Sequence, residues 1–280
     1  KALNIAERVH NELFPFFKTE LNEKTHMVLV DDFDVSNGWA TFYPYAQIRL
    51  FSSPPDTVSG LEVNDDWLHT LIRHEYVHIL HLEMSRGAPK DIRKIFGRVP
   101  VLFPHAITPS FMLEGLATYL ETNDELGYGR LQGSYYAMQM RTEVAEQRLK
   151  SLSDVSAPLR NLPLGMQYLY GSYFFKYLAD TYGEQFIQMY LYHYAGHILP
   201  AVKQNATLEA VIGKGFDQVW PEYLTWLQQQ FAGPIKALTE PQSAAIAGRV
   251  SGQALNLDLG LFKDAVSSQG NRFYYLYNNA

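Results

Sequence analysis

Cysteine is absent from this chain of 280 residues. Disulfide bonds and thiolate metal ligands are therefore excluded, and any metal ion must be bound by histidine, aspartate or glutamate side chains. The sequence also lacks a run of about 18 apolar residues, the length that a transmembrane helix requires. We therefore expect no membrane-spanning segment in this chain.

The chain has fewer positively than negatively charged side chains. The chain has 23 Lys and Arg against 29 Asp and Glu, which gives a net charge of −6 at pH 7. Nucleic acids and anionic lipids attract proteins that carry a surplus of positive charge, so the balance argues against either as the main partner. With 47% hydrophobic residues the chain can bury a full core, in one large domain or two smaller ones.

The motif with the clearest chemical meaning is His74-Glu75-Tyr76-Val77-His78, an H-E-x-x-H sequence. At about 100° per residue in a helix, the two histidines lie one above the other and Glu75 is offset by a single step. Two imidazoles at this spacing bind one tetrahedral ion, with a third protein ligand from elsewhere and water in the fourth position. Glu75 then faces that water as a general base. The alternative is a chance spacing on a core helix.

The segment that carries this motif is predicted to be one buried helix over residues 65–86. Asn64, Asp65 and Asp66 supply capping oxygens and negative charge at its start. Gly87 and Pro89 favour an end just after Arg86. The rest of the chain is expected to support this helix.

A second predicted helix, over residues 110–123, offers the third ligand. Glu114 stands there in an otherwise apolar segment. A buried glutamate without a partner is costly, so Glu114 needs a cation, and we predict that it binds the metal. If it pairs with an arginine or lysine instead, the chain is a helical module without metal. Glu121, two turns along, is a candidate for orienting a ligand histidine, although such a residue is more often solvated.

Other histidines and tyrosines are weaker candidates. His81 lies one turn after His78, nearer the edge of the expected site, where packing is the simpler role. His193 and His197 form a second pair at the same spacing, but Tyr194 stands where the motif has glutamate, so we interpret this pair as structural. Tyrosines of a helix predicted over residues 166–182 are candidates for donating a hydroxyl to a tetrahedral oxyanion, and the pattern alone does not select one.

The remaining elements indicate an α+β chain. Helices are predicted for residues 3–17, 134–150, 166–182 and 216–231, a buried strand for residues 27–30, and an extended segment for residues 38–51. Pro44 cannot donate to a β-ladder, so this segment is expected at a sheet edge or with a bulge. An open edge beside the metal helix would accept an extended peptide by strand addition, or would simply close the sheet.

Together, His74-Glu75-x-x-His78 and Glu114-Gly115-x-Ala117 resemble the gluzincin metallopeptidases, and the chain is most similar to the peptidase MA-like families of exported bacterial proteins. The resemblance runs over about residues 1–235. Three further motifs fit it in order, namely Asn37-Gly38-Trp39-Ala40-Thr41, Asp66-Trp67-Leu68 and Pro109-x-Phe111.

The resemblance implies a thermolysin-like α+β fold, in which a small mixed sheet places an edge strand at the cleft beside paired zinc-binding helices and a helical C-terminal half. It implies that His74, His78 and Glu114 bind Zn²⁺ and that Glu75 is the base. Tyr168, which precedes Gly171 and a helical Phe-x-x-Tyr-Leu segment, becomes the expected oxyanion donor. The chain would be a zinc metallopeptidase, an endopeptidase acting on peptides or proteins, exported to the periplasm.

Two departures from the family pattern stand out. Several gluzincins place an aspartate four residues after the glutamate ligand, where this chain has Thr118. The Gly-x-Met-Glu-Asn sequence of the aminopeptidase branch is also absent, which removes the usual basis for recognising an N-terminal amine. The alternative function is a catalytically inactive, metal-bound scaffold or binding module that presents a β-propeller to partners.

The C-terminal part has a different character. Residues 1–240 are expected to form the peptidase domain, and residues 241–280 a linker followed by the start of a second domain. Residues 262–279 are strand-like, with a turn predicted over residues 267–272. This tail resembles the start of a β-propeller blade of Tol-associated periplasmic proteins, which implies that the chain is the front of a longer protein.

Overall fold

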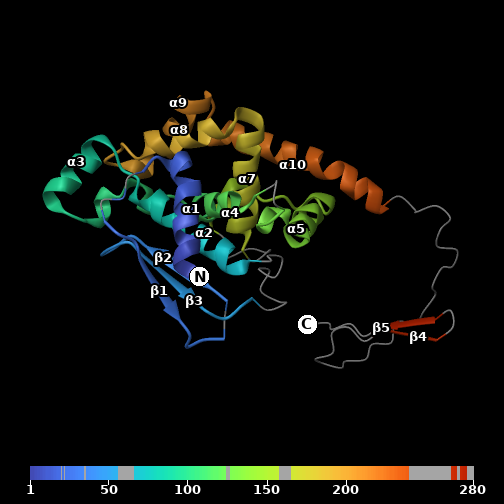
Figure 1. Ribbon diagram of the computed structural model, residues 1–280. Coiled ribbons are helices and arrows are strands. Elements are labelled where there is room, and N and C mark those ends of the chain that lie inside the picture. The colour runs from blue at the N-terminus through green and yellow to red at the C-terminus, as the bar shows by residue number, and fades with distance from the viewer. Residues whose placement is uncertain are drawn as a thin grey trace. The chain divides into compact units, whose positions relative to one another are not determined.

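A computed structural model describes residues 1–19, 21, 23–34, 36–55, 66–123, 127–157, 165–239, 266–269 and 272–275. The contacts divide the chain into two units, residues Lys1–Ala237 and Leu238–Ala280. The first unit combines a small sheet with many helices, which confirms the α+β class. Figure 1 shows the strands of its sheet, drawn in blue, on one side of helix α2 (Trp67–Glu83), with the other helices gathered on the opposite side.

The sheet has three strands, β1 (His26–Val30), β2 (Gly38–Thr41) and β3 (Gln47–Phe51), in the order β1-β3-β2. The central strand β3 is parallel to β1 and antiparallel to β2. Its side chains alternate, as a half-buried strand requires, with Ile48 and Leu50 fully buried. β2 is an edge of the sheet, as expected for this part of the chain.

The single extended segment predicted over residues 38–51 is wrong, because the structure divides it into β2 and β3. Between them the chain passes through a cis peptide bond at Tyr43-Pro44. Pro44 has no N–H and would interrupt a ladder, so its place in the connection leaves both strands intact. The Thr41 hydroxyl donates to the Tyr43 carbonyl at 2.9 Å in this turn.

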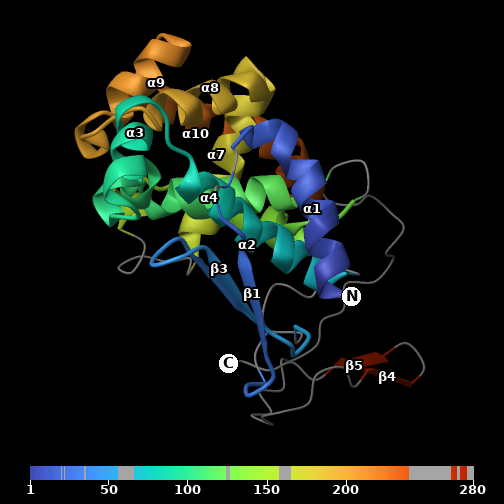
Figure 2. The ribbon, with the colours of Figure 1, turned by 60° about the vertical axis from the view of Figure 1, so that its left-hand side comes forward.

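Helix α2 occupies the centre of the first unit. It contacts β2 and β3 on one side, and α1 (Ala2–Phe17) and α4 (Ser110–Glu121) on others (Figure 2). Every residue from 74 to 83 is buried, as in a helix surrounded by protein. The predicted helix at residues 3–17 is confirmed as α1, but it packs on α2 rather than on the sheet, and His10 Nδ1 lies 2.7 Å from the Tyr76 hydroxyl.

The ends of α2 differ from the prediction. The Asp66 carboxylate accepts a hydrogen bond from the His69 N–H at 3.3 Å and caps the helix, while residues 64 and 65 lie outside the described residues. The helix ends at Glu83 rather than at Arg86. The Arg86 N–H instead donates to the Ala195 carbonyl at 3.1 Å, so a contact with a distant segment decides this end.

A further helix and four 3-10 helices lie outside the helices predicted from the sequence. Gly87 does not stop a helix but begins α3 (Gly87–Phe96), with a positive φ of 55°. The proline-rich connector that follows contains two 3-10 helices, and two more occur later in the chain. They are η1 (Pro100–Leu102), η2 (Pro104–Ile107), η3 (Arg130–Gln132) and η5 (Pro200–Val202).

The helical half comprises α5 (Ser134–Ala145), α6 (Leu152–Ser156), α7 (Met166–Tyr182), α8 (Glu184–Tyr194), α9 (Gln204–Ile212) and α10 (Phe216–Thr239). The prediction for α7 is confirmed, including its end at Gly183. The helix predicted over residues 134–150 ends earlier, since the chain adopts a positive φ at Gln147. The helix predicted over residues 216–231 is longer than expected, because α10 continues through Pro234 to Thr239.

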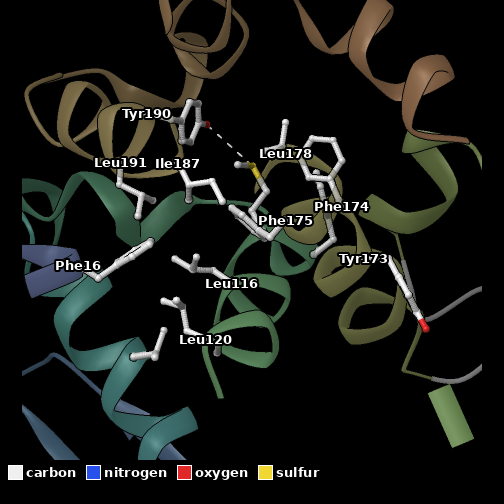
Figure 3. Close-up of a cluster of buried hydrophobic side chains, with 14 of the residues drawn as sticks. Phe16, Leu116, Leu120, Tyr173, Phe174, Phe175, Leu178, Ile187, Tyr190 and Leu191 are labelled. Atoms are coloured by element: carbon white, nitrogen blue, oxygen red, sulfur yellow. Dashed lines mark hydrogen bonds between the residues drawn. The ribbon is translucent and has the colours of Figure 1, made fainter. Parts of the chain in front are cut away.

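The core joins α4, α7 and α8. Figure 3 shows side chains of these helices in one cluster, together with Phe16 of α1. Leu116, Phe174 and Ile187 are almost completely buried in it. The Tyr190 hydroxyl lies 3.9 Å from the Met112 sulfur, the contact drawn as a dashed line. This cluster fixes α4 against α7.

The closest approach in the core is between Gly115 of α4 and Gly171 of α7. A Cβ added at Gly171 would lie 2.0 Å from the Phe111 carbonyl oxygen, and one added at Gly115 would lie 2.4 Å from the Gly171 carbonyl carbon. Real Cβ atoms do not come so close to backbone. Only glycine at both positions permits this crossing, which holds Glu114 of α4 near the first turn of α7.

The second unit contains one described hairpin, formed by β4 (Val266–Gln269) and β5 (Arg272–Tyr275), which pair antiparallel. The turn predicted over residues 267–272 is wrong at both ends, because Ser267, Ser268, Gln269 and Arg272 belong to the strands. The propeller resemblance stays a prediction. Among the described residues, no helix has the length and apolar character needed to cross a membrane.

The glycine crossing gives a test of the fold. Gly171→Ala should destabilise the protein by about 2 to 3 kcal/mol, because the added methyl group overlaps backbone atoms that cannot move freely. Gly233→Ala is the matched control. It adds the same methyl group within a helix, with nothing within 4 Å, and should be neutral or slightly stabilising. Urea unfolding measures both; equal stabilities for the two variants would contradict the packing argument.

Candidate metal centre

The three predicted ligands lie together. His74 and His78 occupy successive turns of α2, and Glu114 comes from α4. Their nearest atoms form a triangle. The two Nε2 atoms are 3.2 Å apart, and Glu114 Oε2 lies 3.3 Å from His74 Nε2 and 3.2 Å from His78 Nε2. The motif spacing and the carboxylate of α4 therefore converge on one point.

This triangle fits a metal ion. Ligand atoms bound at about 2.0–2.1 Å around a tetrahedral ion lie about 3.3–3.4 Å from one another, close to the separations found here. All three atoms offer lone pairs, which repel one another at such distances unless a cation or a shared proton lies among them. Two imidazoles and one carboxylate form a group that can hold a metal ion.

Glu121 orients one of these ligands. Its Oε2 lies 2.8 Å from His74 Nδ1, and the Glu121 side chain is completely buried. An Nδ1–H that donates to this carboxylate leaves the lone pair on Nε2, which is the tautomer that binds metal. Thr118 stands where several gluzincins have such an acid, and its buried hydroxyl has no hydrogen-bond partner among the described residues. Glu121 thus supplies the carboxylate one turn later.

Arg130 of η3 is a site residue that sequence reasoning missed. Its guanidinium binds Glu121 through two nitrogens, with Nε to Oε1 and Nη2 to Oε2 both at 2.6 Å. Nη2 also lies 2.8 Å from His74 Nδ1. No spacing pointed to this residue. The rule that a buried carboxylate needs a cation, applied above to Glu114, would have suggested a basic partner for Glu121 as well.

The charges of these groups follow from their neighbours. Burial alone would raise the pKa of Glu121, but Arg130 and the hydrogen bonds outweigh it and lower that pKa to about 2. Burial likewise opposes ionisation of Glu114, yet its contacts with His74 and His78 hold the Glu114 pKa well below the usual range. Both glutamates are therefore carboxylates at neutral pH.

Glu75 stands in the wall of the cleft next to the ligands. Burial raises the pKa of its carboxyl group, opposed by the nearby His74 and His78. The sheet edge lies directly against it, since a Cβ added at Gly38 of β2 would be 3.2 Å from Glu75 Cγ. A carboxylate with a raised pKa is a better proton acceptor than an exposed one.

Tyr168 faces the same space from the first turn of α7. Its ring centroid lies 6.1 Å from that of His74, and the Arg130 guanidinium carbon is 5.0 Å from the Tyr168 ring centroid. Burial and the Glu114 charge raise the pKa of Tyr168, so its hydroxyl keeps its proton at neutral pH. It is a hydrogen-bond donor beside the metal group.

The cleft has a volume of about 400 Å³. One wall is the edge of the sheet at residues 36–40, and the other comes from α2, with Trp67, Leu71 and Leu82 adding apolar surface. The candidate residues also line the cleft: His74, Glu75, His78, Glu114, Glu121, Arg130 and Tyr168. An extended chain in this cleft would lie between the open strand β2 and the metal group.

The remaining histidines do not join the metal group. His81 is fully buried, with Nε2 at 2.9 Å from His105 Nδ1, and His105 Nε2 lies 3.1 Å from the Leu191 carbonyl. His105 must donate to that carbonyl, so its Nδ1 accepts from His81 and both rings are neutral. His193 is exposed, and His197 Nε2 contacts the Thr207 hydroxyl at 3.1 Å.

No family model, no curated protein and no solved structure matches this chain. The likeness to gluzincins therefore stands on the motifs themselves and on the geometry of the residues that carry them. Of the predicted site residues, all five line one cleft, and the three ligands share one ion-sized space.

Metal binding should depend on the three ligands alone. His74→Ala or Glu114→Ala is expected to abolish binding of one zinc ion per chain, measured by elemental mass spectrometry after dialysis against a zinc buffer. His193→Ala is the matched control, because it removes a histidine from the other pair at the same spacing and should leave the metal content unchanged. Equal zinc content in all variants would contradict the ligand set.

The buried His81–His105 pair should make the fold sensitive to acid. Burial lowers the pKa of His105 to about 3 and holds that of His81 well below its usual range. In the unfolded chain both titrate near about 6.5, so between that pH and about 3 only the unfolded state takes up these protons. The free energy of unfolding should fall by about 1.4 kcal/mol per pH unit for each histidine as the pH decreases.

The variant His105→Gln measures how much His105 contributes to this pH dependence of the free energy of unfolding. The free energy of unfolding is measured with urea at pH 6.5 and at pH 5.0, with a chelator present so that metal release does not contribute. The decrease between the two pH values should be smaller by about 2 kcal/mol in the variant than in the parent. His193→Gln, which changes an exposed histidine, should keep the parental loss. Parallel behaviour of His105→Gln and the parent would show that His105 is not neutral in the fold.

Proposed function

We propose that this chain is a zinc-dependent peptidase of the gluzincin type. The observation that carries the proposal is the position of Glu75, a buried carboxylate beside a His–His–Glu group in a cleft whose wall is an open strand. Each part is common alone. Their combination within one cleft provides a metal site, a proton acceptor and a surface for an extended chain.

Zinc is the metal that the ligands suit best. The group offers two imidazole nitrogens and one carboxylate oxygen, a set typical of catalytic zinc sites in which one coordination position stays open to water or substrate. The absence of cysteine rules out thiolate ligation. The orientation of His74 by Glu121 also matches the way zinc ligands are usually held by a neighbouring carboxylate.

Three residues of the cleft have separate roles in the proposed hydrolysis of an amide bond. A bound zinc ion would supply Lewis acidity, polarising water and the substrate carbonyl. Glu75 takes a proton from the attacking water, which forms the new C–O bond, and passes it to the amine nitrogen as the C–N bond breaks. The Tyr168 hydroxyl donates a hydrogen bond to the oxyanion that develops on the carbonyl oxygen. Arg130, stacked on Tyr168, limits the freedom of that ring.

A peptide is the substrate that this cleft favours. β2 is bonded to β3 on one side only, so its other edge can form main-chain hydrogen bonds with an extended segment. Gly38 brings that edge against Glu75. Apolar surface from Trp67 and Leu71 suits substrates with large apolar side chains. Without a sequence for recognising an N-terminal amine, cleavage within a chain is the expected mode.

The proposed thermolysin-like arrangement follows from the same elements. A small sheet with its edge at the cleft, two helices that carry the ligands and a helical C-terminal half are features expected of that fold. In this proposal, α2 and α4 are the paired zinc helices and α7 brings Tyr168 from the helical half.

Glu75→Gln tests the function. The variant should keep one zinc ion and the parental melting temperature, because the amide has nearly the same size, while kcat for a peptide substrate falls by about 10²-fold or more. Tyr168→Phe should retain the metal and lower kcat without a comparable change in KM. Hydrolysis of a quenched fluorescent peptide library by zinc-loaded protein provides the assay. A parent that holds zinc but cleaves no peptide would favour the inactive scaffold.

A further inference from the structure

One surface of the first unit is built from the end of α3 and three short 3-10 helices. α3 contacts η1, η1 contacts η2, and η2 contacts η5, so segments about a hundred residues apart in sequence form one continuous corner. Each of these 3-10 helices begins with proline. None of their residues lines the metal cleft. The proposed peptidase site therefore does not account for this corner.

This corner exposes large apolar side chains. Six of them are between 50% and 77% exposed, and we call this set the apolar corner: Ile95, Phe96, Val101, Ile107, Leu199 and Val202. Single exposed apolar residues are ordinary, but a contiguous group marks a contact surface. Five of the six are aliphatic, and they come from four adjacent elements or their flanks.

The apolar corner rests on a firmly held base. The guanidinium carbons of Arg93 and Arg98 lie 4.4 Å and 5.0 Å from the ring centroid of the almost fully buried Phe103. Arg98 also donates to the Pro44 carbonyl at 3.0 Å, and both arginines bind Glu83, the last residue of α2. These contacts fix the backbone that carries the exposed side chains. The side chains therefore stay exposed on a rigid part of the fold.

The charge around the apolar corner differs from that of the whole chain. Residues 92–113 and 185–208, which include the six side chains of the apolar corner, contain no Asp or Glu, although the chain has 29 of them. Lys94 and Lys203 lie beside the apolar side chains. At the flank, the Arg86 guanidinium carbon stacks 4.1 Å from the ring centroid of the exposed Tyr192. The nearest acid on α3 is Asp91, paired with Lys94 at 3.0 Å.

We propose that the apolar corner docks on the surface of a phospholipid bilayer. Its aliphatic side chains would enter the boundary of the acyl chains, while the exposed Lys203 and the flanking Arg86 face the phosphates. The net charge of −6, which argued against anionic lipid, is a sum over the whole chain, and the acids next to the apolar corner, Glu23, Glu83 and Asp91, form ion pairs with cations there. Exposed tyrosine at the flank suits the interface, where an apolar ring and a polar hydroxyl are both satisfied.

Two features favour a bilayer over a protein partner. Protein interfaces bury about 800 Å² on each side and concentrate aromatic residues and arginine at their centre. Five of the six side chains of the apolar corner are aliphatic, and Lys94 and Lys203 are neighbours of Ile95 and Val202 in the sequence, a composition that suits an interfacial lipid contact. In both ribbon views α3 lies at the periphery of the helices of the first unit (Figures 1 and 2).

The absence of cysteine permits a direct test. Phe96→Cys or Val101→Cys introduces a single cysteine that can be labelled with an environment-sensitive fluorophore. The emission of this fluorophore should shift to shorter wavelength and become brighter when vesicles of phosphatidylethanolamine and phosphatidylglycerol are added. Leu3→Cys is the matched control, because Leu3 is 72% exposed on α1, outside the apolar corner. A shift at Leu3 equal to that at Phe96, or no shift at any position, would overturn the proposal.

Vesicle sedimentation gives the second measurement. The double variant Ile95→Ser with Phe96→Ser should lower the fraction bound at a given lipid concentration by at least about tenfold, since two large apolar side chains no longer enter the lipid. The control pair, Leu3→Ser with Phe33→Ser, removes one aliphatic and one aromatic side chain of comparable exposure and should bind as the parent does.

Two other outcomes would replace the proposal. If the parent is a dimer in light scattering, does not bind vesicles, and becomes a monomer in the Ile95→Ser/Phe96→Ser variant, the apolar corner is an interface between two copies of the chain. If neither vesicles nor a second copy responds to the double variant while its melting temperature is unchanged, the bilayer assignment fails. The proposal does not depend on peptidase activity, so both measurements keep their meaning with the Glu75→Gln protein.

Discussion

Three electron-rich atoms, the Nε2 atoms of His74 and His78 and a carboxylate oxygen of Glu114, lie within 3.3 Å of one another. They repel one another unless a cation or a shared proton lies among them, so the surrounding structure has to hold them in place. Rigid helices on both sides do this. α2 is buried along the whole stretch that carries the histidines, and α4 is fixed by the core it shares with α7 and α8.

The glycine crossing connects this site to the helical half. Gly115 follows the ligand Glu114 directly, and Gly171 lies one turn after Tyr168, so the backbone contact between α4 and α7 sets the ligand and the tyrosine relative to each other. Arg130 adds a second connection, because its guanidinium binds Glu121 and stacks on Tyr168. The candidate ligand Glu114, the carboxylate of Glu121 that orients His74, and the proposed oxyanion donor Tyr168 therefore share one support.

Helix α2 also joins the site to the apolar corner. Its middle turns supply His74, Glu75 and His78, and its last residue, Glu83, anchors Arg93 and Arg98 beneath the exposed aliphatic side chains. If the corner rests on a bilayer, the cleft is held at a fixed position relative to that surface. The proposed substrates are then peptides or proteins that come close to a membrane, which is a narrower set than the cleft alone would accept.

The sequence by itself determined the local chemistry: the two histidines and Glu75 on one helix, Glu114 on an apolar helix that required a cation, and the α+β class. These follow from spacing and burial cost, which are properties of short segments. The tertiary structure alone decided that Arg130 partners Glu121, that His81 pairs with His105, that α2 ends at Glu83, and that β2 and β3 are separate strands. Each depends on a contact between residues far apart in the chain, and only the packed fold brings such residues together.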